Sequence, residues 1–199
     1  MARSSALTLL FTLAVTACGD DAPAEDSSTA TMGEAMQQAT EAIRQQAGDV
    51  EPVSAEALQD RLPADVDGIE RVDVERTSTG AMGMQISAVV GQYRNTDGRQ
   101  VTIVISDIGG MGATGMMGAA AWAMTEFDRT TDTGYERTGR FEGFKVMESL
   151  SREGSRVRTQ LAIVVGERFI VQLEGRGVDM EVLKDAAKGL DLRGLARMS

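Results

Sequence analysis

Residues 156–174 read RVRTQLAIVVGERFIVQLE and indicate a β-hairpin. Apolar and polar residues alternate on both sides of Gly166, which is the pattern of two strands that each bury one face. The pair Gly166–Glu167 places glycine first in a two-residue turn, and this order predicts a type II′ turn. The side chains expected to face the core are Val157, Leu161, Ile163, Val165, Phe169, Val171 and Leu173.

A second hairpin is expected earlier in the chain. The runs MGMQISAVVGQYR (82–94) and RQVTIVIS (99–106) share the same period of two, and the turn NTDG (95–98) joins them. The pattern predicts that Val101, Ile103 and Ile105 of the second run face the core. From the first run it predicts an inward face made of Met82, Met84, Ile86, Ala88 and Val90.

Helical patterns stand before and after these strands. SAEALQDRL (54–62) begins with Ser54 as a predicted N-cap, and GVDMEVLKDAAKGLDL (177–192) contains Asp179 and Gly189 as predicted caps. The order of strands and helices predicts an α+β fold. In this fold an antiparallel sheet of about 5–7 strands is covered by helices on one or both faces.

The first residues of the chain resemble a bacterial lipoprotein signal. Ala6 to Val15 form an apolar run too short to span a bilayer, and Val15-Thr16-Ala17-Cys18 follows the aliphatic, small, small, cysteine pattern. The resemblance implies cleavage before Cys18 and attachment of diacylglycerol to its sulfur. The alternative is an ordinary signal peptide. Gly19 after the cysteine favours the outer membrane, facing the periplasm, over the inner membrane.

The composition divides the chain into four predicted segments. These are a signal peptide (1–17), the lipidated cysteine with a disordered acidic tether (18–31), N-terminal helices (32–61) and the α+β domain (62–199). In the third segment, Met32, Met36, Ala39 and Ile43 form one stripe of an amphipathic helix. This helix either docks to a partner or a second copy, or lies on its own domain.

Charge and residue usage exclude several classes of function. The net charge of −10 disfavours nucleic acid as a partner. The chain has no histidine, the commonest general base and metal ligand, and its single cysteine rules out an internal disulfide. A non-catalytic protein without a cofactor is therefore expected.

Residues 105–124, ISDIGGMGATGMMGAAAWAM, contain the candidate functional segment. The glycines match G-x-G-x-x-G, but the polar run FDRTTDTGYERTGRF (127–141) that follows does not read as the second parallel strand of a dinucleotide fold. Two interpretations remain: a helix buried on both sides, or a mobile flap that touches a ligand or partner. The flap would consist of Asp107, Gly109, Gly110, Met111, Gly112 and Gly115.

Two further chemistries are possible for this segment. Thioether sulfur suits Cu(I), so Met111, Met116 and Met117 form an alternative copper site, although methionines on a helix also fill gaps in a core. Asp107 is an alternative hydrolytic carboxylate, although an aspartate at a strand end often caps a turn. Tyr135, Arg137 and Arg140 either face a groove or occupy solvated strand positions.

Several runs between Leu62 and Leu195 resemble uncharacterised bacterial lipoproteins. They are LPADVDGIERV, ISDIGG, TGYERTGRFEGFKVMES and ERFIVQLEGRGVDMEVLKDAAKGLDLRGL. The strand meander with its terminal helix is also similar, in topology alone, to PsbP-like domains, which implies a binding or assembly module. Together these observations predict a lipid-anchored cell-envelope protein that binds a protein partner or a small ligand.

Overall fold

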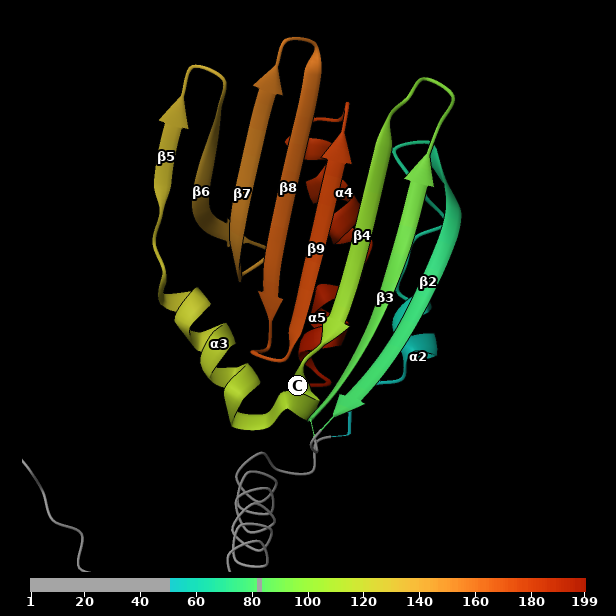
Figure 1. Cartoon of the computed structure of the whole chain (residues 1–199), viewed down its shortest axis with the longest axis vertical. Coiled ribbons are helices and arrows are strands. Elements are labelled where there is room, and N and C mark those ends of the chain that lie inside the picture. Colours follow the sequence, from blue (N-terminus) through green and yellow to red (C-terminus); the bar gives the residue numbers. More distant parts are fainter. Residues whose placement is uncertain (1–50, 82–83) are drawn as a thin grey trace, which may run out of the picture. The chain divides into compact units, whose positions relative to one another are not determined.

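The computed structural model describes residues 51–81 and 84–199, and the fold is a single antiparallel sheet (Figure 1). The described part belongs to one compact unit, Gln37–Ser199. The nine strands are ordered β1-β2-β3-β4-β9-β8-β7-β6-β5. Their bounds are β1 Asp65–Val66, β2 Ile69–Ala81, β3 Met84–Arg94, β4 Gln100–Asp107, β5 Asp128–Thr131, β6 Gly134–Phe141, β7 Phe144–Glu153, β8 Arg156–Val165 and β9 Phe169–Arg176.

Short helices flank this sheet. In Figure 1, α4 and α5 lie behind the sheet, and α3 runs along its lower end between β4 and β5. Contacts place α4 against β8 and β9, and α2 against β2 and β3. The bounds are α2 Ala55–Gln59, the 3₁₀ turn η1 Gly109–Met111, α3 Gly112–Met124, α4 Met180–Lys188 and α5 Leu192–Ala196.

The predicted α+β class with 5–7 strands is wrong, because nine strands form one sheet and the fold is mostly β. The prediction missed strands that lack a buried face. All four residues of β5, DRTT, are exposed, so no apolar alternation marks that strand. β1 has only two residues, which is too few to show a period.

The β8–β9 hairpin is confirmed, with Val165 paired to Phe169. All of its predicted core residues are buried except Val157, which is half-buried. The turn is of a different type from the prediction. Gly166 and Glu167 have φ values of 58° and 55°, and two positive values define a type I′ turn.

The β3–β4 hairpin is also confirmed, but β3 buries the opposite face from the one predicted. Val89 and Tyr93 are buried, whereas Ala88 and Val90 lie on the other side of the sheet. Both faces of β3 carry aliphatic residues, so the period of two does not identify the buried one. The Tyr93 ring lies over Gly91, and its hydroxyl donates to the Pro63 carbonyl at 2.9 Å. Met82 and the Met84 side chain lie outside the described part.

The core fills the space between the sheet and the helices behind it. Ile103, Ile163 and Leu183 are among its fully buried side chains. Ser54 caps α2 as predicted, because its Oγ accepts from the Ala57 amide at 3.3 Å. Asp179 and Gly189 flank α4 as predicted, although the Asp179 side chain makes no capping hydrogen bond.

The other side of the sheet, here called the open face, changes in character along the strands. Near α3 the cross-strand row is Ala88, Ser106, Ile170 and Val164. At the opposite end the corresponding row is Arg94, Gln100, Arg176 and Arg158. The open face therefore runs from small and apolar side chains to arginines. Among the described residues, no helix has the length and apolarity needed to cross a membrane.

Candidate functional site

Asp107, at the end of β4, is fully buried and surrounded by donors. Its carboxylate accepts from the amides of Val53 and Gly109, each at 2.8 Å. Arg168 adds two bonds, from Nε at 2.9 Å and Nη2 at 2.8 Å. Four donors therefore occupy the carboxylate oxygens, and the arrangement favours a structural role for Asp107 over acid–base chemistry.

The glycines that follow Asp107 form a closely packed joint. A Cβ on Gly110 would lie 2.9 Å from Pro52 Cγ and would collide with the Gln85 carbonyl. A Cβ on Gly115 would lie 2.9 Å from the Ile108 carbonyl oxygen and from Met111 Cβ. These contacts show that the glycine-rich part is needed for close approach of backbones within the fold.

From Met117 onward, α3 carries exposed apolar side chains. Met117 is 73% exposed and Met124 is 81% exposed, so the prediction of a helix buried on both sides is wrong for this part. The Met116 side chain lies outside the described residues, and Met111 is half-buried in η1. The copper interpretation therefore stays a prediction that the structure does not test. Cys18 and the predicted helix from Met32 to Ile43 also lie outside the described residues.

A cationic hollow lies at the end of the sheet away from α3. Its volume is about 340 Å³, and three arginines line it: Arg156 and Arg158 from β8, and Arg176 from β9. We call this hollow the arginine pocket. The remaining lining residues, Gly98, Ser155, Val157 and Gly177, belong to β8 or to residues next to the strand ends.

Two of these arginines face each other directly. Arg158 and Arg176 are register partners in the β8–β9 ladder, and such partners have Cβ atoms about 4.5–5.5 Å apart. None of the three arginine side chains makes a hydrogen bond or an ion pair with any described residue. Like charges directly opposite one another destabilise a sheet, so the Arg158–Arg176 pair is an unfavourable contact in the isolated fold.

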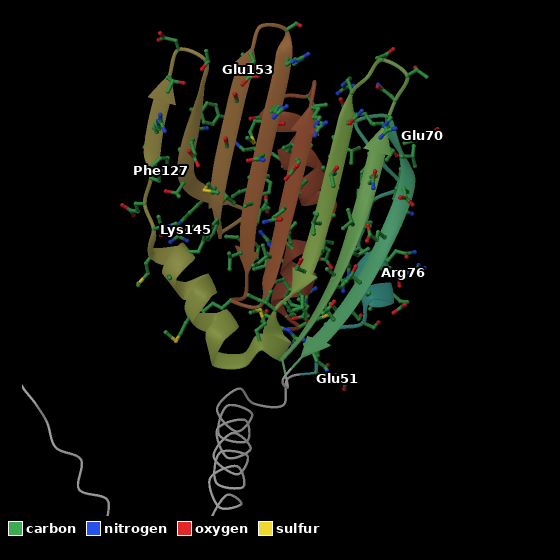
Figure 2. All side chains as sticks on the ribbon, in the orientation of Figure 1. Glu51, Glu70, Arg76, Phe127, Lys145 and Glu153 are labelled. Carbon is green, nitrogen blue, oxygen red and sulfur yellow. The ribbon has the colours of Figure 1, made fainter. Side chains whose placement is uncertain are left out.

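A larger hollow of about 670 Å³ lies between the end of α3 and β6–β7. Figure 2 shows Phe127 just beyond α3 and Lys145 near it. Arg140 and Lys145 line this hollow together with Glu126 and Asp128, so its formal charges balance. Arg140 also donates to the Gly143 carbonyl at 3.4 Å. The larger hollow therefore lacks the charge imbalance of the arginine pocket.

Arg137 and Tyr135, singled out from the sequence, belong to an ionic cluster on the helix-covered face, in which Glu148 is buried and the Arg137 side chain is 48% exposed. Arg137 lies over the Tyr135 ring, with Cζ 4.6 Å from the ring centroid, and bonds Glu148 at 2.9 Å. Lys184 of α4 bonds the other oxygen of Glu148 at 3.0 Å. Burial would raise the pKa of Glu148, but the hydrogen bonds from Lys184 and Arg137 hold it below its ordinary value.

Sequence reasoning missed the arginine pocket. The signal was present in RVR, residues 156–158, because two arginines separated by one residue share a face of a strand. The hairpin register then sets Arg176 opposite Arg158. The net charge of −10 concealed this local excess of positive charge, because it sums over the whole chain.

Comparison with known proteins gives no match: no family model, no curated protein and no solved structure matches the chain.

Proposed function

We propose that this protein is a lipid-anchored, non-catalytic cell-envelope module that binds an oxyanion-bearing ligand in the arginine pocket. The observation that supports this most strongly is the direct opposition of Arg158 and Arg176 without an acidic partner. A bound anion would turn this repulsion into two attractive contacts. Glu153 is the register partner of Arg156, and Glu174 lies two residues before Arg176 on β9, but neither exposed glutamate forms an ion pair with the three arginines.

The chemistry of arginine indicates the class of ligand. Guanidinium groups donate in a planar fork that matches phosphate or carboxylate oxygens in pairs. The volume of about 340 Å³ is near the lower end of small-molecule sites. Three arginines in this space favour a small ligand, or a short part of a polymer, that carries more than one negative group.

The predicted anchor is compatible with this site. In Figure 2, Glu51 lies at one end of the sheet and Glu153, next to the arginine pocket, lies at the other. Cys18 precedes Glu51 in the chain, and the described part of the chain begins at Glu51, at the end away from the pocket. Mass spectrometry of Cys18 in the mature protein tests the anchor separately.

The proposal of a non-catalytic role rests on the state of the buried carboxylates. Asp107 is filled by four donors, and Glu148 is held by Lys184 and Arg137. Both carboxylates are therefore occupied by donors from within the fold. Within residues 51–81 and 84–199, no three His, Cys, Asp or Glu side chains gather as a metal site would require.

Thermal unfolding in low salt tests the pocket, with phosphate, pyrophosphate, sulfate and citrate as probes. A ligand at a hundred times its dissociation constant adds about 2.7 kcal/mol, which is several degrees for a chain of this size. We expect pyrophosphate or citrate to raise the melting temperature, and added salt to weaken the effect. The absence of a shift with every probe would contradict the proposal.

Two variants make the test specific. Arg158→Gln removes one charge of the opposed pair, so we expect it to raise the stability of the anion-free protein by about 0.2–1 kcal/mol. The same change should abolish the response to anions. Arg129→Gln is the matched control, because Arg129 is an exposed arginine on β5 outside the pocket. An equal loss of response in this control would indicate non-specific charge screening.

A further inference from the structure

We propose that the exposed side of α3 lies in the surface of the bilayer to which the chain is anchored. The inference rests on the proposed lipid anchor for its location, but its test does not depend on acylation. It concerns the end of the fold opposite the arginine pocket. It therefore gives the protein a membrane-facing end and a ligand-facing end.

The first observation behind this proposal is that α3 is uncharged and carries exposed apolar side chains. Gly112–Met124 contains no charged residue. In the described part of the chain the exposed large hydrophobic residues are Val72, Met117, Met124 and Phe127, and all but Val72 lie on α3 or just after it. Exposed apolar groups concentrated on one element mark an interaction site, whereas single ones such as Val72 are ordinary.

Three of the exposed residues described in α3 lie on one side of the helix. Met117, Ala121 and Met124 are all exposed, and their spacing of four and three places them in one stripe. Trp122 lies on another side of the helix and is half-buried. Tryptophan is favoured at the boundary between water and lipid because its ring is apolar and its N–H is polar. The helix is far too short to span the bilayer, so it would lie in the plane of the surface.

The path of the chain indicates which surface covers this stripe. Glu51 and Val53 are fixed beside the start of α3: Arg168 Nη2 donates to the Glu51 carbonyl at 3.0 Å, and the Val53 amide donates to Asp107 at 2.8 Å. The described part of the chain therefore begins beside the start of α3, on the side of the sequence that leads back to Cys18. An acylated Cys18 would keep α3 close to lipid, and this raises the effective concentration of the bilayer around the helix.

The charges near α3 indicate which lipid headgroups the helix would contact. Glu126 and Asp128 follow the helix directly, and the whole chain carries a net charge of −10. Anionic lipid would repel both. Contact is therefore apolar, and we expect it to be strongest with zwitterionic lipid.

Trp122 makes the inference directly measurable, because it is the only tryptophan in the chain. The unacylated chain beginning at Gly19 keeps the compact unit Gln37–Ser199 whole. On addition of vesicles of phosphatidylcholine and phosphatidylethanolamine, we expect its emission to shift to shorter wavelength. We also expect quenching by brominated acyl chains and protection from acrylamide. The same brominated-lipid quenching is expected for the acylated chain reconstituted in these vesicles.

Variants separate a specific contact from general adsorption. Met117→Glu places a charge in the stripe at a position outside both hollows, and we expect at least a tenfold loss of vesicle partitioning. Met117→Leu should keep the partitioning. Val72→Glu is the matched control, since Val72 is an exposed apolar residue on β2.

Three results would overturn the inference. One is a Trp122 emission that vesicles leave unchanged. Another is an equal loss of partitioning in Val72→Glu. The third is a blue shift that appears without vesicles as protein concentration rises, with dimers seen by light scattering, because α3 would then bind a second copy of the chain. Anion binding in the arginine pocket should be unchanged in Met117→Glu, so failure of either proposal is distinguishable from failure of the other.

Discussion

Asp107 and Arg168 join four separate parts of the chain through one ion pair. The Asp107 carboxylate holds the amides of Val53 and Gly109, and Arg168 also donates to the Met198 carbonyl at 2.6 Å. The pair thus links the segment before α2, the end of β4, the β8–β9 turn and the C-terminus. The sequence singled out Asp107 by its place at a strand end. It offered no signal for Arg168, which lies 61 residues away.

Asp107→Asn should destabilise the protein strongly. The substitution keeps the shape of the side chain but leaves Arg168, which is only 14% exposed, without its counter-charge. Removal of one partner of a buried pair costs about 3–5 kcal/mol. Urea unfolding measures the loss.

Asp67→Asn is the control for this change. Asp67 pairs with Arg99 at the surface, where its side chain is 54% exposed, and an exposed pair contributes at most about 1 kcal/mol. Asparagine also tolerates the positive φ of 52° at this position. Similar losses of unfolding free energy in the two variants would show that the Asp107–Arg168 pair stabilises the fold no more than an exposed pair does.

The joint between β4 and α3 depends on glycine at some positions and not at others. Gly110→Ala should cost about 1–3 kcal/mol, because the added methyl group would meet the Gln85 carbonyl and Pro52. Gly118→Ala should stabilise the protein by up to about 1 kcal/mol, since a Cβ at Gly118 meets nothing within 4 Å and alanine favours the helix. Denaturant unfolding of both variants checks the two signs. A loss of stability in both variants would contradict the predicted difference between the two glycines.

The sequence predicted some secondary-structure elements correctly and failed for others. Both hairpins, α2 and α4 were predictable because their apolar residues repeat at the period of a strand or a helix and their ends carry turn or cap residues. The buried face of β3 was not, because that choice depends on Tyr93 packing over Gly91 and bonding Pro63. Exposure of α3 was not predictable either. An apolar sequence does not reveal whether a neighbouring element covers it.

At the scale of the whole molecule, the sheet brings the two parts of the chain together at its centre. β4 pairs with β9, so strands from the N-terminal and C-terminal parts are direct neighbours. Only the helix-covered face is filled by a core. The two candidate surfaces, α3 and the arginine pocket, lie at opposite ends of this sheet. The net charge of the sequence could not indicate this separation, because it depends on strand register.

Glu148 is the link between the helix layer and the far half of this sheet, and it makes the stability of the whole molecule sensitive to acid. Its carboxylate lies on β7 and binds Lys184 of α4 and Arg137 of β6. The pKa of Glu148 in the folded protein lies below the ordinary value of 4.5: burial opposes this direction, and the two hydrogen-bonded cations outweigh burial. The ionised form is therefore bound more tightly in the folded state than in the unfolded state. Its contribution to stability is complete above the unfolded pKa and is lost as pH falls through the lower folded pKa.

Glu148→Gln should show this dependence as a difference between two pH profiles of unfolding free energy. At neutral pH we expect a loss of about 1–3 kcal/mol, since Lys184 keeps only its longer ion pair with exposed Glu181, and Arg137 loses its charged partner. The profiles of the variant and the wild type should begin to approach each other as pH falls below about 4.5, and should meet only below the lower pKa of the folded protein, where the wild-type carboxyl is neutral as well. Glu153→Gln, at an exposed position on the same strand, should follow the wild type throughout. A constant gap between Glu148→Gln and the wild type at every pH would mean that the ion pairs do not link α4 to the sheet, and that the loss comes from packing alone.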